Sequence, residues 1–222
     1  AVTILNVQNN IRYILKNRSM KKKIKNLLLL SGFLLLIQHI QAQANTALWD
    51  KLSLEVQYGM NTALSPKDNS TTSDYNGFKF FQAGINYQID EIWGVRGTYA
   101  MSNFKHKNLD GFGVSYKKLV LEGTYNILAA VNKAPQLFDI TAHAGLGLGM
   151  GASETLKDDD MVGVFQVGLM PKYTFNSRIS AFLDATYVNQ FSQDYGFNGL
   201  AIKQGSGSYL NVGLGVQVRL GK

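Results

Sequence analysis

The chain has 222 residues, enough for one domain with a sizeable core, and its lack of Cys excludes disulfide bonds, thiolate-ligated metals and a thiol nucleophile. The formal net charge is +7, from 22 Lys and Arg against 15 Asp and Glu, but residues 1–44 carry seven of the basic residues and no acidic one. Residues 45–222 are therefore neutral, with 15 basic against 15 acidic residues, so the sequence predicts no nucleic-acid partner.

Residues 20–44 have the order of a secretory signal peptide. A basic cluster after Met20 is followed by the apolar stretch 27–37. Its eleven residues are far fewer than the roughly 20 that a transmembrane helix needs, so a membrane anchor is disfavoured. Cleavage after Ala44 or Ala42 would follow the usual pattern of small residues. The predicted organisation is an upstream, non-native extension over 1–19, a signal peptide over 20–44 and one mature domain over 45–222.

Apolar and polar residues alternate along most of the mature domain, as in a β-strand whose two faces meet different surroundings. Leu54 and Val56, for example, alternate with Glu55 and Gln57. Segments of about ten residues suit strands tilted across a bilayer better than soluble strands of about five or six residues. The pattern predicts eight strands, at 52–58, 81–89, 93–101, 119–125, 138–151, 163–175, 179–191 and 208–220.

The links between these predicted strands alternate in length. The links after strands two and six are short, although the link after strand four, 127–136, is longer. Long, polar links follow the odd-numbered strands, at 65–76, 103–115, 153–162 and 192–207. This rhythm predicts an up-and-down barrel with short periplasmic turns, long external loops and both termini in the periplasm.

The two faces of the strands indicate which solvent surrounds the barrel. The apolar face carries aromatic residues, predicted to form interfacial girdles: Trp49, Tyr58, Tyr87, Trp93, Tyr99, Tyr125, Phe138, Tyr173 and Tyr187. The other face carries titratable residues, predicted to form a lumen charge network: Glu55, Arg96, Glu122, Asp139, His143, Lys172, Asp184 and Arg219. A soluble barrel of the lipocalin type could not place so many charges in its core. The sequence therefore predicts an all-β fold, an eight-stranded antiparallel up-and-down transmembrane β-barrel.

Several strand sequences resemble those of the OmpA-like outer-membrane β-barrel family. The resemblance rests on the signal peptide and on segments 122–126, 142–147 and 211–222, and it covers about all of residues 49–222. It implies a non-enzymatic, membrane-embedded protein of Gram-negative bacteria, with a structural, adhesive or weakly pore-forming role. The family's peptidoglycan-binding domain has no counterpart in this stretch.

The lumen of an eight-stranded barrel is just wide enough to be filled by side chains. Neighbouring strands predict three ion pairs, Arg96–Glu122, Asp139–Lys172 and Glu55–Arg219, and leave Asp184 and His143 to find partners across the interior. We therefore expect a lumen plugged by paired charges. The alternative is a gate, in which rearrangement of these pairs opens a narrow, porin-like channel.

The sequence predicts no catalytic, cofactor-binding or metal-binding residues. The glycine run 145–151 lacks the spacing of a dinucleotide loop, and the acidic run 158–160 lacks that of a calcium loop. A weaker alternative is a lipid A-modifying enzyme, in which His106 would meet Ser102 or Ser115 in space.

The remaining expectations concern one awkward residue and the partners. Pro171 cannot donate a hydrogen bond to a strand ladder, so we expect it at a bulge near the periplasmic end of strand six. The predicted partners are outer-membrane lipid and lipopolysaccharide, the barrel-insertion machinery and an unknown extracellular ligand for the loops. The protein is expected to be a monomer.

Overall fold

The structure, a computed structural model, describes residues 46–65, 72–131 and 137–221. The chain divides into two compact units, 1–45 and 46–222, and every described residue belongs to the second. The predicted upstream extension and signal peptide lie outside the described residues.

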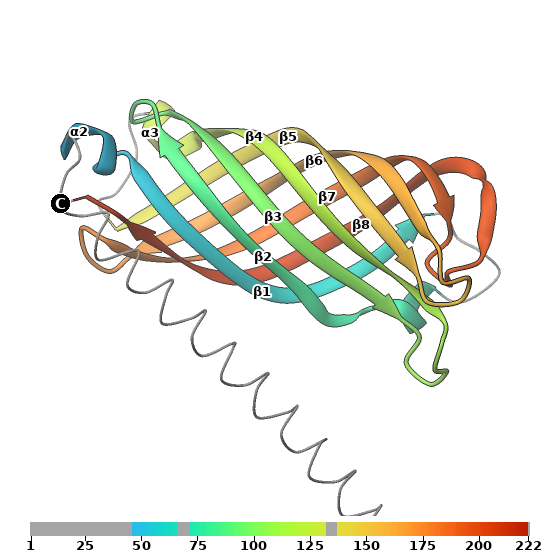
Figure 1. The fold of residues 1–222 in the computed structure, drawn as a ribbon. Coiled ribbons are helices and arrows are strands. Elements are labelled where there is room, and N and C mark those ends of the chain that lie inside the picture. The colour runs from blue at the N-terminus through green and yellow to red at the C-terminus, as the bar shows by residue number, and fades with distance from the viewer. Residues whose placement is uncertain (1–45, 66–71, 132–136, 222) are drawn as a thin grey trace, which may run out of the picture. The chain divides into compact units, whose positions relative to one another are not determined.

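Eight antiparallel strands form a closed barrel in chain order (Figure 1). The strands are β1 (Leu52–Ser65), β2 (Gly77–Gln88), β3 (Trp93–Lys105), β4 (Gly113–Asn126), β5 (Phe138–Ser153), β6 (Asp159–Thr174), β7 (Ile179–Tyr195) and β8 (Ala201–Arg219). The short helical segments are α2 (Thr46–Trp49), η1 (Thr72–Tyr75) and α3 (Ile127–Ala130). Strand β1 pairs with β8, with Glu55 opposite Gln217, so no strand is left as a free edge. The predicted fold class is confirmed.

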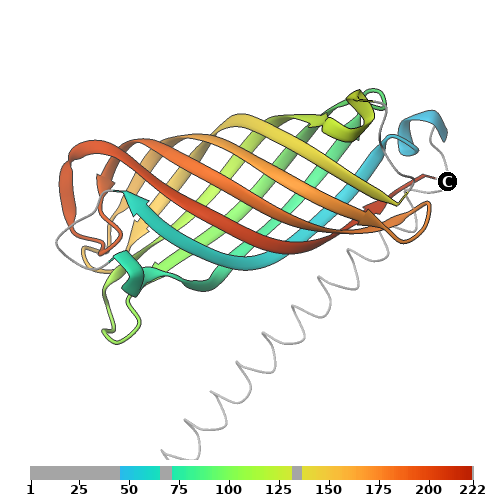
Figure 2. The same ribbon diagram turned by 180° about the vertical axis from the view of Figure 1, so that it is seen from behind.

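The two ends of the barrel differ in what they carry. Helices α2 and α3 and the C-terminal end of the chain lie at one end, which we call the terminus end (Figure 1). Segment η1 and the connections that follow β1, β3, β5 and β7 lie at the other, which we call the loop end (Figure 2). Asn126 explains the longer link after β4, because its side chain accepts a hydrogen bond from the Ala129 N–H and caps the single turn of α3.

The strands extend further toward the loop end than the alternation predicts. Strands β7 and β8 have 17 and 19 residues, and only residues 196–200 connect them, whereas the sequence predicts a link over 192–207. At about 3.3 Å per residue and a tilt of about 40°, such strands rise about 45 Å, well above an apolar band of about 25 Å. Polar residues therefore continue the ladder beyond the apolar band, where alternation gives no signal.

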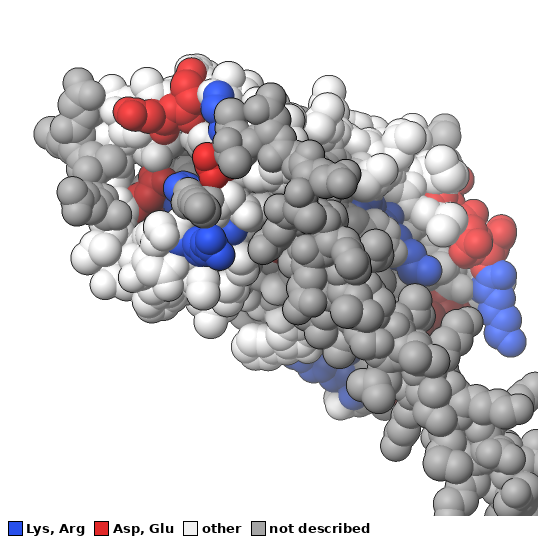
Figure 3. Space-filling view, turned by 60° about the vertical axis from the view of Figure 1, so that its left-hand side comes forward, with Lys and Arg blue, Asp and Glu red and all other residues white. Residues whose placement is uncertain are grey.

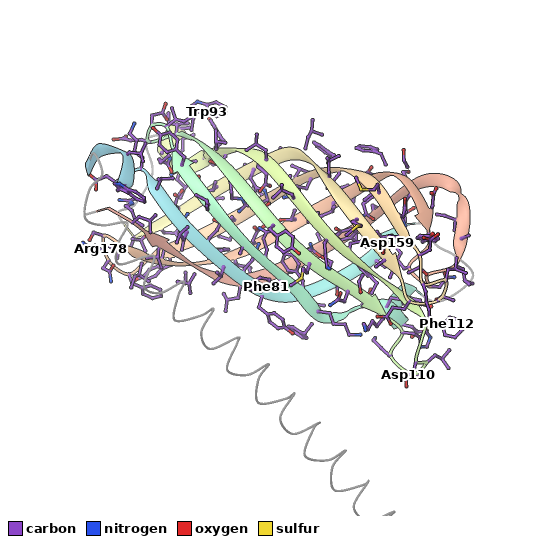
Figure 4. All side chains as sticks on the ribbon, in the orientation of Figure 1. Phe81, Trp93, Asp110, Phe112, Asp159 and Arg178 are labelled. Atoms are coloured by element: carbon purple, nitrogen blue, oxygen red, sulfur yellow. The ribbon has the colours of Figure 1, made fainter. Side chains whose placement is uncertain are left out.

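Burial follows the alternation expected for a barrel with a polar interior. In β4 the side chain of Leu121 is 65% exposed, whereas that of its neighbour Glu122 is 1% exposed. The same alternation of exposed apolar and buried polar residues recurs in the other strands. Figure 4 shows side chains projecting from the outside of the barrel. An apolar exterior around a polar interior is the inverse of a soluble barrel.

Pro171 is accommodated differently from the prediction. It lies in β6 opposite Ile140 of β5, near the terminus end. The pairing of β6 with β7 passes from Leu169 to Lys172 without a register shift, so the proline occupies a gap in the ladder and the predicted bulge is wrong. No bulge is needed, because the residues on either side of Pro171 keep the same register with β7.

Candidate functional site

Arg96 of β3 lies at the centre of the lumen, fully buried, and contacts three carboxylates. Its Nε is 2.7 Å from Glu122 Oε2, as their opposite positions in the register of β3 and β4 predict. Its Nη1 is 3.2 Å from Glu55 Oε1 and 3.3 Å from Asp184 Oδ2. Three strands on different sides of the barrel are therefore joined through one guanidinium, whose fork of donors can serve several oxygens at once.

His143 of β5 joins two of the same carboxylates. Its Nδ1 lies 2.7 Å from Glu122 Oε1, and its Nε2 lies 3.1 Å from Asp184 Oδ1. Both ring nitrogens face carboxylate oxygens, which suits a doubly protonated ring. Nδ1 also lies 3.2 Å from Arg96 Nη2, which can only donate, so a neutral ring with its lone pair on Nδ1 can accept from Arg96. His143 and Asp184 were left to find partners across the interior, and the structure places them in contact with each other, with Glu122 also on His143 and Arg96 also on Asp184.

Lys118 of β4 belongs to the same layer, and the sequence analysis missed it. It is 3% exposed, and its Nζ donates to Gln166 Oε1 at 2.5 Å. Gln166 in turn donates to Glu122 Oε1 at 2.8 Å. Lys118 shares the inward positions of Glu122 and Thr124 in β4, so a strict two-residue count from Glu122 would have found it.

We call Glu55, Arg96, Lys118, Glu122, His143 and Asp184 the central charge layer. Arg96 and His143 contact the three carboxylates directly, and Lys118 is joined to Glu122 through Gln166. The formal charges of the layer therefore balance when His143 carries a proton. Neutrality and hydrogen bonding are what allow charges to persist away from water.

Glycines make room for these side chains. A Cβ at Gly168 would lie 2.5 Å from His143 Nε2, so any other residue there would displace the imidazole. A Cβ at Gly151, in the glycine run 145–151, would lie 2.6 Å from the ring of Tyr116. The run therefore gives space to bulky side chains of the lumen.

An apolar layer fills the lumen between the central charge layer and the loop end. Phe104, Tyr116, Phe197 and Tyr209 are buried there and contact one another, with ring centroids 4.6 Å apart for Phe104 and Phe197. Lys118 Nζ lies 5.6 Å from the ring centroid of Tyr209, which connects the two layers. We call these four residues the aromatic layer. The sequence did not predict this layer, because Phe104 and Tyr116 lie beyond the predicted strand ends and Phe197 lies in the connection between β7 and β8, so that only Tyr209 falls within a predicted strand.

At the terminus end, the predicted network is only partly present. Lys172 Nζ lies 3.3 Å from Asp139 Oδ2, and Asn126 donates to the same oxygen at 2.8 Å. The predicted Glu55–Arg219 pair is wrong. Arg219 lies opposite Ser53 in the register, one inward position below Glu55, and is exposed at the rim, so Glu55 contacts Arg96 instead.

The predicted aromatic girdle residues on the strands lie on the outward side of the barrel in two groups, whereas Trp49 lies in α2. Trp93 and Tyr125 pack against each other at the terminus end, with ring centroids 4.7 Å apart and ring planes tilted by 59°. The group at that end comprises Tyr87, Trp93, Tyr125, Phe138 and Tyr173. The second group, Tyr58, Tyr99 and Tyr187, is exposed but lies within the strands and not at their termini.

The position of the second group follows from strand length. An apolar band of about 25 Å is crossed by about ten tilted residues, so its outer boundary falls within strands of this length. Exposed Lys117, eight positions from Tyr125 in β4, lies near that boundary. Because the strands are longer than predicted, these tyrosines lie within the strands, and their outward direction is as predicted.

Neither a metal site nor a membrane-spanning helix is present in the described part of the chain. No group of three or more His, Asp or Glu side chains among those residues could hold a metal ion. No helix in the same part is long and apolar enough to cross a bilayer.

Comparison with known proteins identifies the architecture. No family model matches the sequence, and no curated protein sequence matches it significantly. Among solved structures, Neisserial surface protein A is similar with a TM-score of 0.53 and 14% identity, covering 76% of this chain and 97% of that one. The chain has the fold of an eight-stranded outer-membrane barrel. The predicted resemblance to OmpA-like barrels is confirmed at the level of the fold.

Two further solved structures show the same likeness more weakly. The N-terminal β-barrel domain of Pseudomonas aeruginosa OprF has a TM-score of 0.43 and 13% identity, over 75% of this chain and 96% of that one. The attachment invasion locus protein of Yersinia pestis, Ail, has a TM-score of 0.42 and 13% identity, over 75% and 97%.

Proposed function

We propose that this protein is an integral outer-membrane barrel with a closed lumen, whose loop end faces outward and has a structural or surface-interaction role. The observation that carries the proposal is the exposed apolar surface that surrounds the closed barrel. Leu121 and Leu146, for example, lie opposite each other on β4 and β5, with 65% and 66% of their surfaces exposed. A continuous apolar surface of this kind is unfavourable in contact with water and favourable in contact with lipid.

Gel migration tests the membrane assignment. The purified barrel is expected to need detergent, and the unboiled protein is expected to migrate differently from the boiled one, because a closed ladder resists detergent. Variants of the interior provide the matched control, since they change the lumen and leave the outer surface alone. A protein that stays monomeric in plain buffer without detergent would contradict the proposal.

The loop end is built as one platform, which supports an interaction role. Thr155 Oγ1 donates to the carbonyl oxygens of Asn198 at 2.8 Å and Gly111 at 3.2 Å, and Ser153 Oγ donates to the carbonyl oxygen of Gly199 at 2.6 Å. These bonds join three connections that are distant in the sequence. Rigid loops on a barrel are suited to binding, and lipopolysaccharide and an extracellular ligand are the partners we propose for them.

A closed lumen is favoured over a narrow channel because two different layers fill it. Ions would have to pass the central charge layer and then the apolar aromatic layer. Recording in planar bilayers tests this. We expect no conductance from the wild type or from Arg96→Ala, because the aromatic layer remains in place. Steady conductance of the wild type, or channels that open when Arg96 is removed, would instead favour the gated channel.

A lipid A-modifying activity is the less favoured alternative. His106 Nδ1 accepts hydrogen bonds from the backbone N–H groups of Asn108 and Leu109, and its Nε2 lies 3.9 Å from Asp74. Ser102 is buried in the lumen, with its Oγ 3.4 Å from Asn211. No hydroxyl nucleophile accompanies the imidazole in these contacts. Mass spectrometry of lipid A from cells with and without the protein is expected to give identical spectra, and a change in acylation would support the enzyme.

A further inference from the structure

A cavity of about 450 Å³ opens inside the barrel at the terminus end. Its walls come from β1, β2, β4, β5, β6, β7 and β8 and from the turn before β7. Figure 3 turns this end toward the viewer and shows Lys and Arg side chains beside Asp and Glu side chains there. The volume lies within the range of small-molecule sites, about 300–1,000 Å³.

The charged residues that line this cavity are mostly basic. They are Lys51, Asp139, Lys172, Arg178 and Arg219. The single carboxylate, Asp139, is held by Lys172 at 3.3 Å and by Asn126 at 2.8 Å. Lys51 Nζ donates to the carbonyl oxygen of Ile89 at 2.8 Å. After the Asp139–Lys172 ion pair is taken into account, the cavity wall still carries more positive than negative charge.

Arg178 and Arg219 concentrate that excess on one side. The Arg219 N–H donates to the carbonyl oxygen of Arg178 at 2.8 Å, so Arg178, in the turn before β7, lies beside the last residue of β8. Neither guanidinium forms an ion pair with a carboxylate of the described residues. The hydroxyls of Ser53, Ser177 and Ser180 line the same cavity and can add donors. Both residues are exposed at the rim, and two neighbouring cationic residues there raise the positive potential that an anion would meet.

We propose that the terminus-end cavity binds a small soluble anion that carries phosphate groups, with Arg178 and Arg219 as its main contacts. Two planar forks suit the several oxygens of such a ligand. Ser53 and Ser180 occupy buried inward positions, so the cavity opens along the barrel axis to water and not sideways to the bilayer. This geometry favours a dissolved ligand over a lipid headgroup.

Calorimetry with inorganic pyrophosphate tests the proposal, using the full chain in a zwitterionic detergent. We expect binding at one site, weakened about tenfold or more in Arg178→Gln/Arg219→Gln, because the double variant loses the charged hydrogen bonds of both guanidinium groups. Lys107→Gln, which removes the same kind of charge at the loop end, is the matched control and should bind like the wild type. Gel migration of unboiled samples verifies that each variant is folded.

Three outcomes would overturn the assignment. The first is no binding of millimolar pyrophosphate by the wild type. The second is equal binding by the wild type and the double arginine variant. The third is arginine-dependent binding to vesicles containing phosphatidylglycerol without binding of pyrophosphate, which would make the ligand a headgroup.

Discussion

Arg96 is the residue on which the interior depends most. Its guanidinium faces Glu55, Glu122 and Asp184, and all four side chains are buried. Removing it leaves three carboxylates with only His143 and Lys118 to balance them. A buried charge that loses its partner destabilises a fold far more than a surface charge does.

We therefore expect Arg96→Ala to lower the free energy of unfolding by about 3–5 kcal/mol. Lys107→Ala, an exposed loop residue, should change it by less than about 0.5 kcal/mol. Denaturant unfolding in detergent micelles, followed by tryptophan fluorescence, measures both. Equal stability of the two variants would show that the guanidinium is not what balances the central charge layer.

Asp90, in the turn between β2 and β3, gives a prediction about pH. Its Oδ1 accepts from the N–H groups of Trp93 at 2.7 Å and Ile92 at 2.8 Å, and these bonds lower the pKa of the carboxyl. A lowered pKa means that the carboxylate stabilises the fold above its unfolded pKa, and that the effect is lost as pH falls through the folded pKa.

The stability difference between the wild type and Asp90→Ala should therefore be present at neutral pH and shrink as pH falls below about 4, where the unfolded carboxyl titrates. Unfolding curves at several pH values in micelles measure it. Asp90→Asn keeps an oxygen acceptor without the charge and is the control, because its difference from Asp90→Ala should not vary with pH. A constant difference between the wild type and Asp90→Ala would contradict this account.

At the scale of the elements, each strand carries two series of residues at alternate positions, one facing outward and one facing inward. In β4 the outward series includes Leu119 and Leu121, and the inward series includes Lys118 and Glu122. A one-residue slip would exchange the two series and place charges in lipid, so the register is strongly specified.

Leu121→Arg tests which solvent the outward series meets. Leu121 lies five positions from the terminus end of β4, within the band of about ten residues, and an arginine at mid-bilayer costs about 2–4 kcal/mol. Leu156→Arg, at an exposed connection of the loop end, should have almost no effect. Reversible unfolding from lipid vesicles compares the two. If both arginines are equally harmless, the outward face of β4 does not contact lipid.

At the scale of the whole molecule, the barrel has stacked levels along its axis. The basic cavity lies at the terminus end, the central charge layer in the middle and the aromatic layer toward the loop end. Beyond these, β7 and β8 continue as an extension with register shifts after Gln190 and Gln193. Local stability is expected to differ between such levels, since an irregular ladder near water opens more easily.

Hydrogen exchange in micelles should therefore be slow for 180–188 of β7 and faster for 193–195, although both belong to one strand. The comparison lies within a single strand, so differences in overall stability cancel. Mass spectrometry of peptides from the two segments measures it. Uniform protection along β7 would mean that residues 193–195 are locally as stable as residues 180–188, which would contradict this expectation.

Much of this architecture can be predicted from the sequence, because a strand's period of two is a local property. The alternation predicted eight strands, the residues of each strand that face outward, and the Arg96–Glu122 pair, without any knowledge of distant contacts. The alternation did not predict where the strands end, because the ladder continues through polar residues beyond the bilayer. For the same reason it did not predict that Tyr58 lies within a strand, nor the inward rings of Phe104 and Tyr116 in the aromatic layer.

What the sequence by itself determined was the kind of barrel, since apolar and polar residues separate onto two faces whatever the closure. Only the tertiary structure decided the partners inside, because contacts across a lumen depend on barrel stagger, which no local pattern records. The curvature of the barrel brought Glu55 to Arg96 and left Arg219 at the rim, and the pairing of β7 with β8 placed Arg219 beside Arg178 around a cavity.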